Sequence, residues 1–429
     1  MRAAFYESDV TPPLGGYMWG HYREKRAVEV HERLHAKALV VEDGGEVAAI
    51  VVIDSCAIPE GMREVVTERI FEYTGIPADK VCIASNHTHY GVPIHDSPEI
   101  NCFADAAYRD VFYRVVADTV TLAYHRLAES DVQFGTSIAS GIAFCRNAEL
   151  EDGTFVTHPR YKKHVKRLLD TPDEELPVLL FERDGKPYGA LVCFACHQCT
   201  VREEVMGYSG DYAAVLSARL KERYGADFVT LFLLGTCGDV NQNDPNPENT
   251  FPNHKGIGER LAGFFASSVS SVVPIGNGVD IVTETVTVPR RSALLADNMT
   301  RLAEFTKDST PMRLHNLVSY TSVPRPEASE LVVQCMRIGD ILIACLPGEI
   351  YTAFGRRIKE SSPFAHTIVV ENCNSYCGYI PTAEVFDPER DRLYETALCG
   401  HSCHVPEAGN MLADAALALA DRLHKEYTK

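Results

Sequence analysis

Several features that would assign the chain to a specialised class are missing from its sequence. There is no run of about 18 consecutive apolar residues, which excludes a transmembrane helix. The N-terminal segment has no apolar core of the secretory type, so no signal peptide is expected. Basic runs are also missing, and 41 Lys and Arg against 59 Asp and Glu give a formal charge of −18. Because this charge repels phosphate groups, binding to nucleic acid or to anionic membranes is not expected.

What the sequence does contain is typical of a globular protein. Hydrophobic residues make up 45% of the 429 residues, and charged residues make up 23%. The 14 cysteines, without an export signal, fit a reducing compartment better than a disulfide scaffold. Many of them lie in apolar runs, where a thiol behaves as a small buried hydrophobe. We therefore predict a soluble cytoplasmic protein whose partner is a small molecule, and the oligomeric state stays open.

The order of predicted elements indicates an α/β protein. The chain shows no internal repeat, low-complexity segment or linker that would separate domains. Apolar β-branched runs predict strands at 37–43, 47–53, 81–85, 189–195, 228–234, 279–289 and 331–347, the last with a hairpin turn at Gly339-Asp340. Helical patterns fill 60–75, 106–128, 212–224, 256–272, 350–360 and 408–425. We predict one large unit over residues 1–429, with a smaller β-rich lobe over 280–345 as the alternative division.

Four of the apolar strand patterns run directly into polar or reactive side chains. His87 and His89 follow the pattern at 81–85, and His197 follows the one at 189–195. The pattern at 228–234 leads into Asn241, and the one at 331–347 leads into Glu349. Since active sites of open α/β folds gather at strand ends, these four endings are expected to converge on one site.

The His-x-His pair indicates the chemistry of that site. On an extended segment, residues two apart share a face, so His87 and His89 can point into one cleft. Two neutral imidazoles and a carboxylate, with one position left open, are the usual ligands of catalytic zinc. The pair alone is a weak signal, because surface or core histidines are common. Together with His197 and Glu349 at similar strand ends, it favours a zinc site.

A series of short segments gives a more specific indication. They are DVTPPLGGYMWGH (9–21), HERLHAKALVVED (31–43), SNHTHYGVP (85–93), FCRNAE (144–149), SGDYAAVL (209–216), LLGTCGDVNQN (233–243), LPGEIYTAFGRRIK (346–359) and NSYCGYIPTAEVF (374–386). In this order, the chain resembles the N-terminal catalytic region of the neutral, non-lysosomal ceramidase family. The resemblance implies that family's fold, a large α/β sandwich of mixed sheets, and a metal-dependent hydrolase.

The resemblance also implies metal ligands. The family binds zinc through the first His of its His-Thr-His, a later strand-end His, the Glu of Pro-Gly-Glu and a Tyr. The corresponding residues here are His87, His197, Glu349 and Tyr379, and Tyr379 is favoured over Tyr376. One Zn²⁺ per chain is the expected cofactor.

Other site residues are predicted by position. His89 would transfer protons or face the substrate, Arg146 would anchor it, and Tyr394 would be a further catalytic residue. Asp211, His401 and His404 are predicted substrate contacts, although the cluster of His401, Cys403 and His404 matches no family segment. A polar loop with a buried thiol is the alternative interpretation of that cluster.

The chain departs from the family pattern in ways that affect its function. Asn241 stands where the family has a serine that is a proposed nucleophile or oxyanion contact. Asparagine can donate a hydrogen bond to an oxyanion but cannot form an acyl intermediate. The chain ends soon after the last matching segment, so the family's C-terminal immunoglobulin-like domain is expected to be absent.

These residues lead to three functional hypotheses. The first is a zinc-dependent amidase, in which metal-bound water attacks an N-acyl bond of a small polar substrate rather than membrane ceramide. The second is a zinc enzyme that acts on a sugar, by cleaving a glycosidic bond or shifting a proton beside a carbonyl. The third is a binding protein that has lost catalysis, a reading motivated by Asn241.

Overall fold

Three large β-sheets form the frame of the molecule in the computed structural model. The structure describes residues 1–21, 24–97, 102–159, 162, 164–201, 205–246, 248–249, 252–291, 325–387 and 390–427. The first sheet has the order β5-β4-β3-β1-β6 and consists of β1 (Arg2–Asp9), β3 (His35–Asp43), β4 (Glu46–Ile53), β5 (Val81–Ser85) and β6 (Ala128–Glu129). The second has the order β15-β13-β12-β7-β17 and consists of β7 (Asp131–Ile138), β12 (Glu175–Arg183), β13 (Lys186–Phe194), β15 (Val229–Leu234) and β17 (Val273–Pro274). The third, β18-β19-β20-β22, consists of β18 (Val279–Pro289), β19 (Ala328–Ile338), β20 (Ile341–Cys345) and β22 (His366–Val370).

The three sheets repeat one connection pattern. In each, a strand pairs antiparallel with the first strand of a hairpin, and the second hairpin strand pairs parallel with a strand that follows a helix. The series are β1-β3-β4-β5, β7-β12-β13-β15 and β18-β19-β20-β22. A glycine with positive φ lies in each hairpin turn, at Gly44, Gly185 and Gly339, because a tight turn requires the left-handed conformation there. The sequence shows no repeat, so the repetition exists only at the level of topology.

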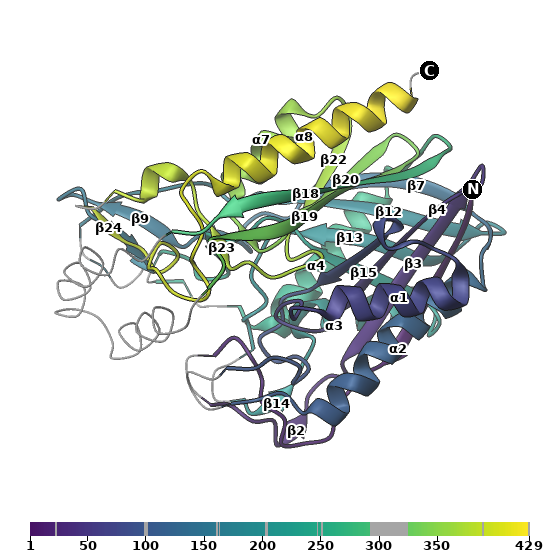
Figure 1. The fold of residues 1–429 in the computed structure, drawn as a ribbon, viewed down its shortest axis with the longest axis horizontal. Coiled ribbons are helices and arrows are strands. Elements are labelled where there is room, and N and C mark those ends of the chain that lie inside the picture. Colours follow the sequence, from purple (N-terminus) through teal and green to yellow (C-terminus); the bar gives the residue numbers. More distant parts are fainter. Residues whose placement is uncertain are drawn as a thin grey trace.

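Each sheet is covered on its outer face by a pair of helices. One helix connects the two parallel strands, and the next follows the last strand (Figure 1). The pairs are α1 (Met62–Thr74) with α2 (Ala106–Tyr124), α3 (Asp211–Tyr224) with α4 (His254–Val269), and α7 (Thr352–Ser361) with α8 (Ala408–Tyr427). Three separate hydrophobic clusters join these pairs to their sheets.

The inner faces of the three sheets share a common core. Along β3, Leu39 and Val41 point into this core, whereas Ala38 and Val40 contact the helix-covered cluster. This alternation follows from the two-residue period of a strand and explains why the strands are apolar on both faces. The common core also contains side chains of β18, β19 and β20.

Short paired strands and single 3₁₀ turns lie in the segments that connect the elements of the large sheets. They are β2 (Glu29–Val30) with β14 (Gly207–Tyr208), β8 (Phe144–Cys145) with β16 (Val240–Asn241), β21 (Glu349–Ile350) with β23 (Tyr379–Ile380), and the group β9 (Asn147–Leu150), β10 (Phe155–Thr157), β11 (Val165–Leu168) and β24 (Asp391–Arg392). The 3₁₀ turns are η1 (Ala78–Lys80) and η4 (Ala383–Val385).

The predicted fold class is confirmed, and most predicted elements have a counterpart. The expected hairpin at Gly339-Asp340 joins β19 to β20, where Ile338 pairs with Ile341. The strands β1, β7, β12 and β22 were not predicted. The proposed lobe over 280–345 lies partly outside the described residues, which exclude 292–324. The division of the chain into domains therefore stays a prediction.

Two further observations concern the cysteines and the helices. The part of the chain that the structure describes includes all 14 cysteines and contains no disulfide, and only Cys199 is not buried. Among the described helices, none has the length and apolar character needed to cross a bilayer.

Candidate metal centre and active site

The end of β5 presents His87 in an unusual backbone conformation. His87 has a φ of 67°, in the left-handed region that non-glycine residues rarely adopt. The Nδ2 of Asn86 donates to Asp54 Oδ1 at 2.6 Å, and the Oδ1 of Asn86 accepts from the backbone N–H of Thr88 at 3.2 Å. These bonds brace the residues on both sides of His87. The Nδ1 of His87 lies 2.5 Å from the carbonyl oxygen of Cys56, which sets the direction of the ring.

His197 follows β13 and is held in a similar way. Its Nδ1 lies 2.9 Å from the carbonyl oxygen of Cys237 and 3.0 Å from that of Val240. Since a carbonyl can only accept, Nδ1 carries the proton in both His87 and His197. In the neutral form of each ring, the lone pair is then on Nε2.

The carboxylate of Glu349 faces both of these Nε2 atoms. Its Oε2 lies 3.0 Å from the Nε2 of His197 and 3.3 Å from the Nε2 of His87. Glu349 follows Gly348, which has a φ of 79°, and a Cβ at position 348 would meet the backbone oxygen of Gly378 at 2.6 Å. Glycine is therefore required for the chain to bring Glu349 into place.

The group of His87, His197 and Glu349 fits a bound metal ion. One ligand atom from each residue lies within 4.8 Å of the others, and all three side chains are almost fully buried. Among the described residues, the Nε2 of His87 has no hydrogen-bond partner. A buried acceptor without a donor is costly, and a cation would satisfy it. Two imidazoles and a carboxylate are the donor set of catalytic zinc sites.

The protonation states of the three residues agree with this assignment. Burial and the Arg146 guanidinium lower the pKa of His197 to about 4, so its imidazole is neutral. Burial alone would raise the pKa of Glu349, but His87 and His197 hold it well below its usual range. Burial alone would lower the pKa of His87, but Cys56 and Glu349 raise it well above its usual value. A proton on His87 is thus the charge that a metal ion would replace.

Two tyrosines lie beside the carboxylate. The hydroxyl of Tyr376 donates to Glu349 Oε1 at 2.8 Å. Tyr379 is the strand partner of Glu349 in the β21–β23 pair, and its ring lies parallel to that of His197 with 6.3 Å between centroids. The choice of Tyr379 as a fourth ligand stays a prediction.

Arg146 lies next to the predicted ligands. Its Nε donates to Glu395 Oε1 at 2.7 Å, and its Nη2 donates to the carbonyl oxygen of Gly238 at 2.7 Å. The Nη1 is 3.5 Å from the Nε2 of His197. Because Glu395 compensates its charge, Arg146 can be almost fully buried and still point N–H groups at the site.

His89 forms the adjacent wall. Its ring meets that of His87 edge to face at 5.1 Å, and its Nδ1 lies 2.9 Å from the carbonyl oxygen of Gly20. The Nε2 of His89 is buried and has no partner within the described residues. Burial, together with His87, His21 and His197, lowers the pKa of His89 well below its usual value. His89 is therefore a neutral imidazole with a lone pair available on Nε2.

The comparison with known families agrees with this geometry. Residues 6–255 match the family model of the neutral/alkaline non-lysosomal ceramidase, N-terminal region, which is more than half of the chain. The chain belongs to this ceramidase family. The predicted family resemblance is thereby confirmed, and the protein is a hydrolase.

Solved structures show the same ceramidase fold. The crystal structure of neutral ceramidase from Pseudomonas aeruginosa has a TM-score of 0.74 and 19% sequence identity, and the alignment covers 98% of this chain and 74% of that one. A ceramidase complexed with C2 has a TM-score of 0.75 and 18% identity, with coverage of 99% and 75%. No curated protein matches the sequence.

The remaining predicted residues of this ceramidase-family chain fall into two groups. Tyr394 and His401 stack on each other with 4.9 Å between ring centroids, and both contact the ring of Tyr379. They extend the wall of the site. His404 lies elsewhere, with its Nε2 2.9 Å from Ser329 Oγ. The cluster predicted at 401–404 is therefore divided between two environments.

Asp211 and Asn241 make mostly local contacts. The carboxylate of Asp211 accepts from the backbone N–H and the hydroxyl of Thr200, and so braces the segment after His197. The Oδ1 of Asn241 accepts from the backbone N–H of Asn243 at 2.9 Å. Their roles toward a substrate stay predictions.

Some contacts of the site had no signal in the sequence. The hydroxyl of Tyr376 and the carbonyl of Cys56 reach the ligands from distant segments. The single tryptophan, Trp19, stacks on His95 at 4.7 Å and meets Tyr376 edge to face at 5.3 Å. Nothing in the sequence around Trp19 indicated that this N-terminal segment contacts Tyr376.

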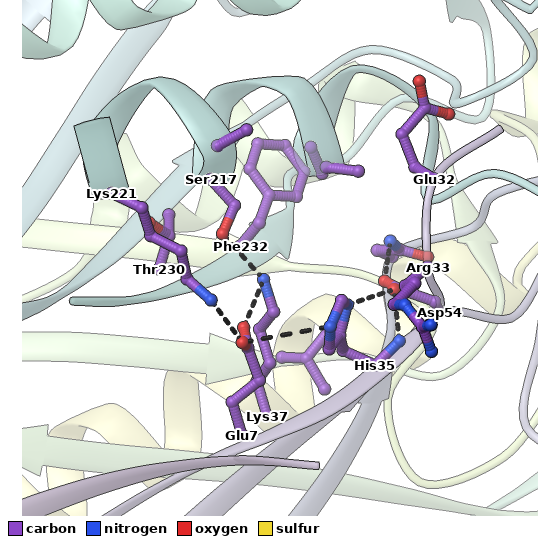
Figure 2. A pocket seen from close by; sticks show the side chains of 15 residues that line it. Glu7, Glu32, Arg33, His35, Lys37, Asp54, Ser217, Lys221, Thr230 and Phe232 are labelled. Carbon is purple, nitrogen blue, oxygen red and sulfur yellow. Dashed lines mark hydrogen bonds and ion pairs between the residues drawn. The ribbon is translucent and has the colours of Figure 1, made fainter. Parts of the chain in front are cut away.

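A second polar region lies between the first sheet and α3. Here Glu7, His35 and Lys37 from the sheet face Ser217 and Lys221 from the helix across a cavity of about 250 Å³. Figure 2 shows both lysines pointing at the carboxylate of Glu7. The Nζ of Lys37 is 3.2 Å from Glu7 Oε2 and donates to Ser217 Oγ at 3.0 Å. We call this region the charged cavity.

Proposed function

We propose that the protein is a zinc-dependent hydrolase that cleaves the amide bond of a small, polar N-acyl compound. The observation that carries the proposal is the convergence of the Nε2 atoms of His87 and His197 on the carboxylate of Glu349. Both imidazoles are oriented through Nδ1 by backbone carbonyls, as is usual for histidines that bind zinc. Family membership supports hydrolysis of an amide.

His87, His197 and Glu349 would hold the ion, with Tyr379 as the fourth ligand. When bound, zinc would supply a hydroxide nucleophile at neutral pH and polarise the carbonyl of the substrate. The hydroxyl of Tyr376 fixes one oxygen of Glu349, which leaves the other for the metal. The remaining steps belong to side chains of the chain itself.

His89 is placed to move a proton. Its lone pair on Nε2 has no other use in the structure, and its ring touches that of His87. As a neutral base it would accept a proton from the attacking water and deliver it to the leaving amine. The contact of its Nδ1 with the carbonyl of Gly20 keeps the ring in the required tautomer.

Arg146 and Asn241 are proposed to stabilise the oxyanion. The guanidinium of Arg146 is fixed by Glu395 and by the carbonyl of Gly238, so it would need no reorganisation during the reaction. Asn241 lies next to Val240, whose carbonyl contacts His197. The stacked pair of Tyr394 and His401 would hold the body of the substrate.

A polar substrate is favoured over membrane ceramide by charge and by the packing of α8. The formal charge of −18 opposes approach to anionic lipid. The apolar stripe of α8, which includes Leu412, Leu419 and Leu423, is buried against the third sheet. It is therefore not available for insertion into a bilayer. We also propose a cytoplasmic location on the basis of the cysteine content.

A sugar substrate is the second candidate. The planar surface of Tyr394 and His401, beside the ion pair of Arg146 and Glu395, has the mixture of rings and charges that suits a pyranose. In that case the same metal centre would act on a glycosidic bond or beside a carbonyl.

The test is a substrate screen with the purified, zinc-loaded protein. Short N-acyl amino acids, aryl glycosides and ceramide in anionic vesicles would be compared, with His197→Ala as the inactive control and the exposed His125→Ala as the matched histidine control. Release of amine from soluble N-acyl compounds, lost only in His197→Ala, is expected. Preferential turnover of ceramide together with vesicle binding would overturn the choice of substrate. Hydrolysis of glycosides alone would establish the second candidate, and inactivity on all three would favour a binding protein.

A further inference from the structure

Three buried cysteines meet in the common core, apart from the metal centre. Cys82 lies on β5, Cys345 ends β20, and Cys373 follows β22. Their sulfur atoms all lie within 4.8 Å of one another, and each side chain is fully buried. A backbone bridge between Ala84 and Cys373 joins the segments of the first and third sheets. We call Cys82, Cys345 and Cys373 the thiol cluster.

The thiol cluster differs from other buried cysteines of the chain. Cys335 donates to the carbonyl oxygen of Ala416 at 3.4 Å, and Cys145 donates to that of Asn147 at 3.5 Å. Those thiols each find a backbone acceptor of their own. In the thiol cluster, Cys373 also contacts a backbone carbonyl, that of Glu371 at 3.5 Å, but here three sulfurs from three separate segments lie together as well. Packing alone requires small apolar side chains at such positions but does not require three sulfurs to converge.

The electrostatics of the cluster favour one ionised sulfur. Hydrogen bonds from Cys345 and Cys373, together with the Arg63 guanidinium, hold the pKa of Cys82 well below its usual value. Burial and the two neighbouring sulfurs raise the pKa of Cys373 well above its usual value. The directions of these shifts favour ionisation of Cys82 over that of Cys373.

We propose that Cys82, Cys345 and Cys373 form a three-coordinate site for one thiophilic monovalent cation of the copper(I) class. Thiolate sulfur is a soft ligand that selects copper(I) over hard cations. A metal in the plane of three sulfurs at about 2.3 Å would place them about 4.0 Å apart, and the three sulfurs here all lie within 4.8 Å of one another. Structural zinc requires a fourth ligand, and no His, Asp or Glu joins this group among the described residues.

Binding would leave the buried charge unchanged. Copper(I) enters as a monovalent ion, one S–H bond breaks, and its proton leaves to solvent. Two thiolates and one thiol then hold the ion with a net charge of −1, as before binding. No electron is transferred. Starting from a thiolate at Cys82, the exchange therefore adds no further charge to the core.

The experiment is an anaerobic titration of the zinc-loaded protein with copper(I) against the chelator bathocuproine disulfonate. One equivalent of copper per chain is expected to resist the chelator, with three sulfur neighbours at about 2.3 Å by X-ray absorption. Copper should also raise the unfolding temperature of the wild-type protein. No retained copper, or a site with nitrogen ligands, would overturn the proposal.

Variants separate the thiol cluster from the other thiols and from the metal centre. Cys82→Ala/Cys345→Ala should lose the retained copper, whereas Cys335→Ala, an equally buried cysteine on β19, should keep it. His87→Ala/His197→Ala should keep it as well, so the result does not depend on the proposed function. If the double cysteine variant fails to fold, Cys373→Ser should reduce the sulfur neighbours from three to two. Unchanged copper binding in Cys82→Ala/Cys345→Ala or in Cys373→Ser would refute the site.

Discussion

The candidate metal centre is a buried group of ionisable side chains and the charged cavity a partly buried one, and their charges are balanced differently. In the charged cavity, the carboxylate of Glu7 faces the ammonium groups of Lys37 and Lys221, so charges of both signs lie side by side within the fold. In the metal centre, two imidazole nitrogens and one carboxylate converge with their acceptor sides toward one another. The first group holds its own counter-charges, whereas the second is proposed to take a cation from outside.

This difference separates a structural role from a functional one. Buried charges that neutralise one another contribute to the fold and are disturbed when either partner is removed. Buried acceptors without donors are a cost that the fold tolerates because a ligand later relieves it. The two regions should therefore respond in opposite ways to substitution, the first in stability and the second in metal content and turnover.

The largest effect is expected from removing the metal ligands. His87→Ala/His197→Ala should reduce bound zinc from one per chain to a trace and abolish hydrolysis, because Glu349 alone cannot hold the ion. Metal analysis after dialysis is the measurement. His125→Ala, on the surface, should keep both metal and activity. Stoichiometric zinc in the double variant would remove the assigned centre.

The next effect concerns the oxyanion. Asn241→Ala should slow turnover by roughly 10²–10³-fold while zinc content stays at one per chain, because a hydrogen-bond donor is lost only in the transition state. Asn241→Ser should keep substantial activity. A covalent adduct trapped on the protein during turnover would contradict direct attack by water.

A smaller effect is expected at the tyrosine beside Glu349. Tyr376→Phe removes the hydrogen bond to Glu349 Oε1 and should weaken zinc binding by about 10–100-fold, as for other groups that orient a ligand. Competition with a chelator measures this change. The exposed Tyr73→Phe serves as the control. If Tyr379→Phe weakens binding no more than the control does, Tyr379 is not a ligand.

The smallest effect on function is expected from Glu7→Gln. This substitution tests the charged cavity. Burial alone would raise the pKa of Glu7, but Lys37, His35 and Lys221 lower it to about 2 from an ordinary value of 4.5. The native state then binds fewer protons than the unfolded state between these values. Its stabilisation, about 3 kcal/mol, is present above pH 4.5 and is lost as the pH falls toward 2.

Denaturant unfolding of the Glu7→Gln variant at several pH values checks this expectation. The variant should be less stable than the wild type at pH 7 and should approach it at low pH, with unchanged zinc content. Glu129→Gln, which removes a surface ion pair with the N-terminus, should show little change. A loss of zinc in Glu7→Gln would mean that the two regions are not independent.

Much of the fold could be predicted because its buried strands are local apolar runs. The pattern at 81–85 corresponds to β5 residue for residue, and the pattern at 189–195 overlaps β13 over residues 189–194. The strand β12 was missed because it contains Pro177, which argues against a central strand, yet Pro177 pairs with Thr136 there. The repetition of one connection pattern in three sheets had no signal in the sequence. Hairpin pairing depends on the alternation of apolar and polar residues and on turn residues, and unrelated sequences share both.

The convergence of three predicted ligands could be predicted from the sequence, but the groups that orient them could not. His87, His197 and Glu349 each follow an apolar strand, a pattern visible in the sequence. Their supporting groups, such as the carbonyl of Cys56 and the hydroxyl of Tyr376, depend on contacts between loops of different sheets. No local pattern encodes which carbonyl will face which imidazole nitrogen.

The threefold arrangement has a consequence for how the protein is made. Each sheet leads into one of the three proposed metal ligands, and His197 and Glu349 are separated by 152 residues along the chain. A growing polypeptide can complete its first and second sheets before the third has left the ribosome, but it cannot yet hold the ion. Long loops must close before these contacts form, which makes assembly of the centre a late event in folding. Zinc uptake during refolding should therefore lag behind the appearance of secondary structure and report the moment at which the last sheet docks.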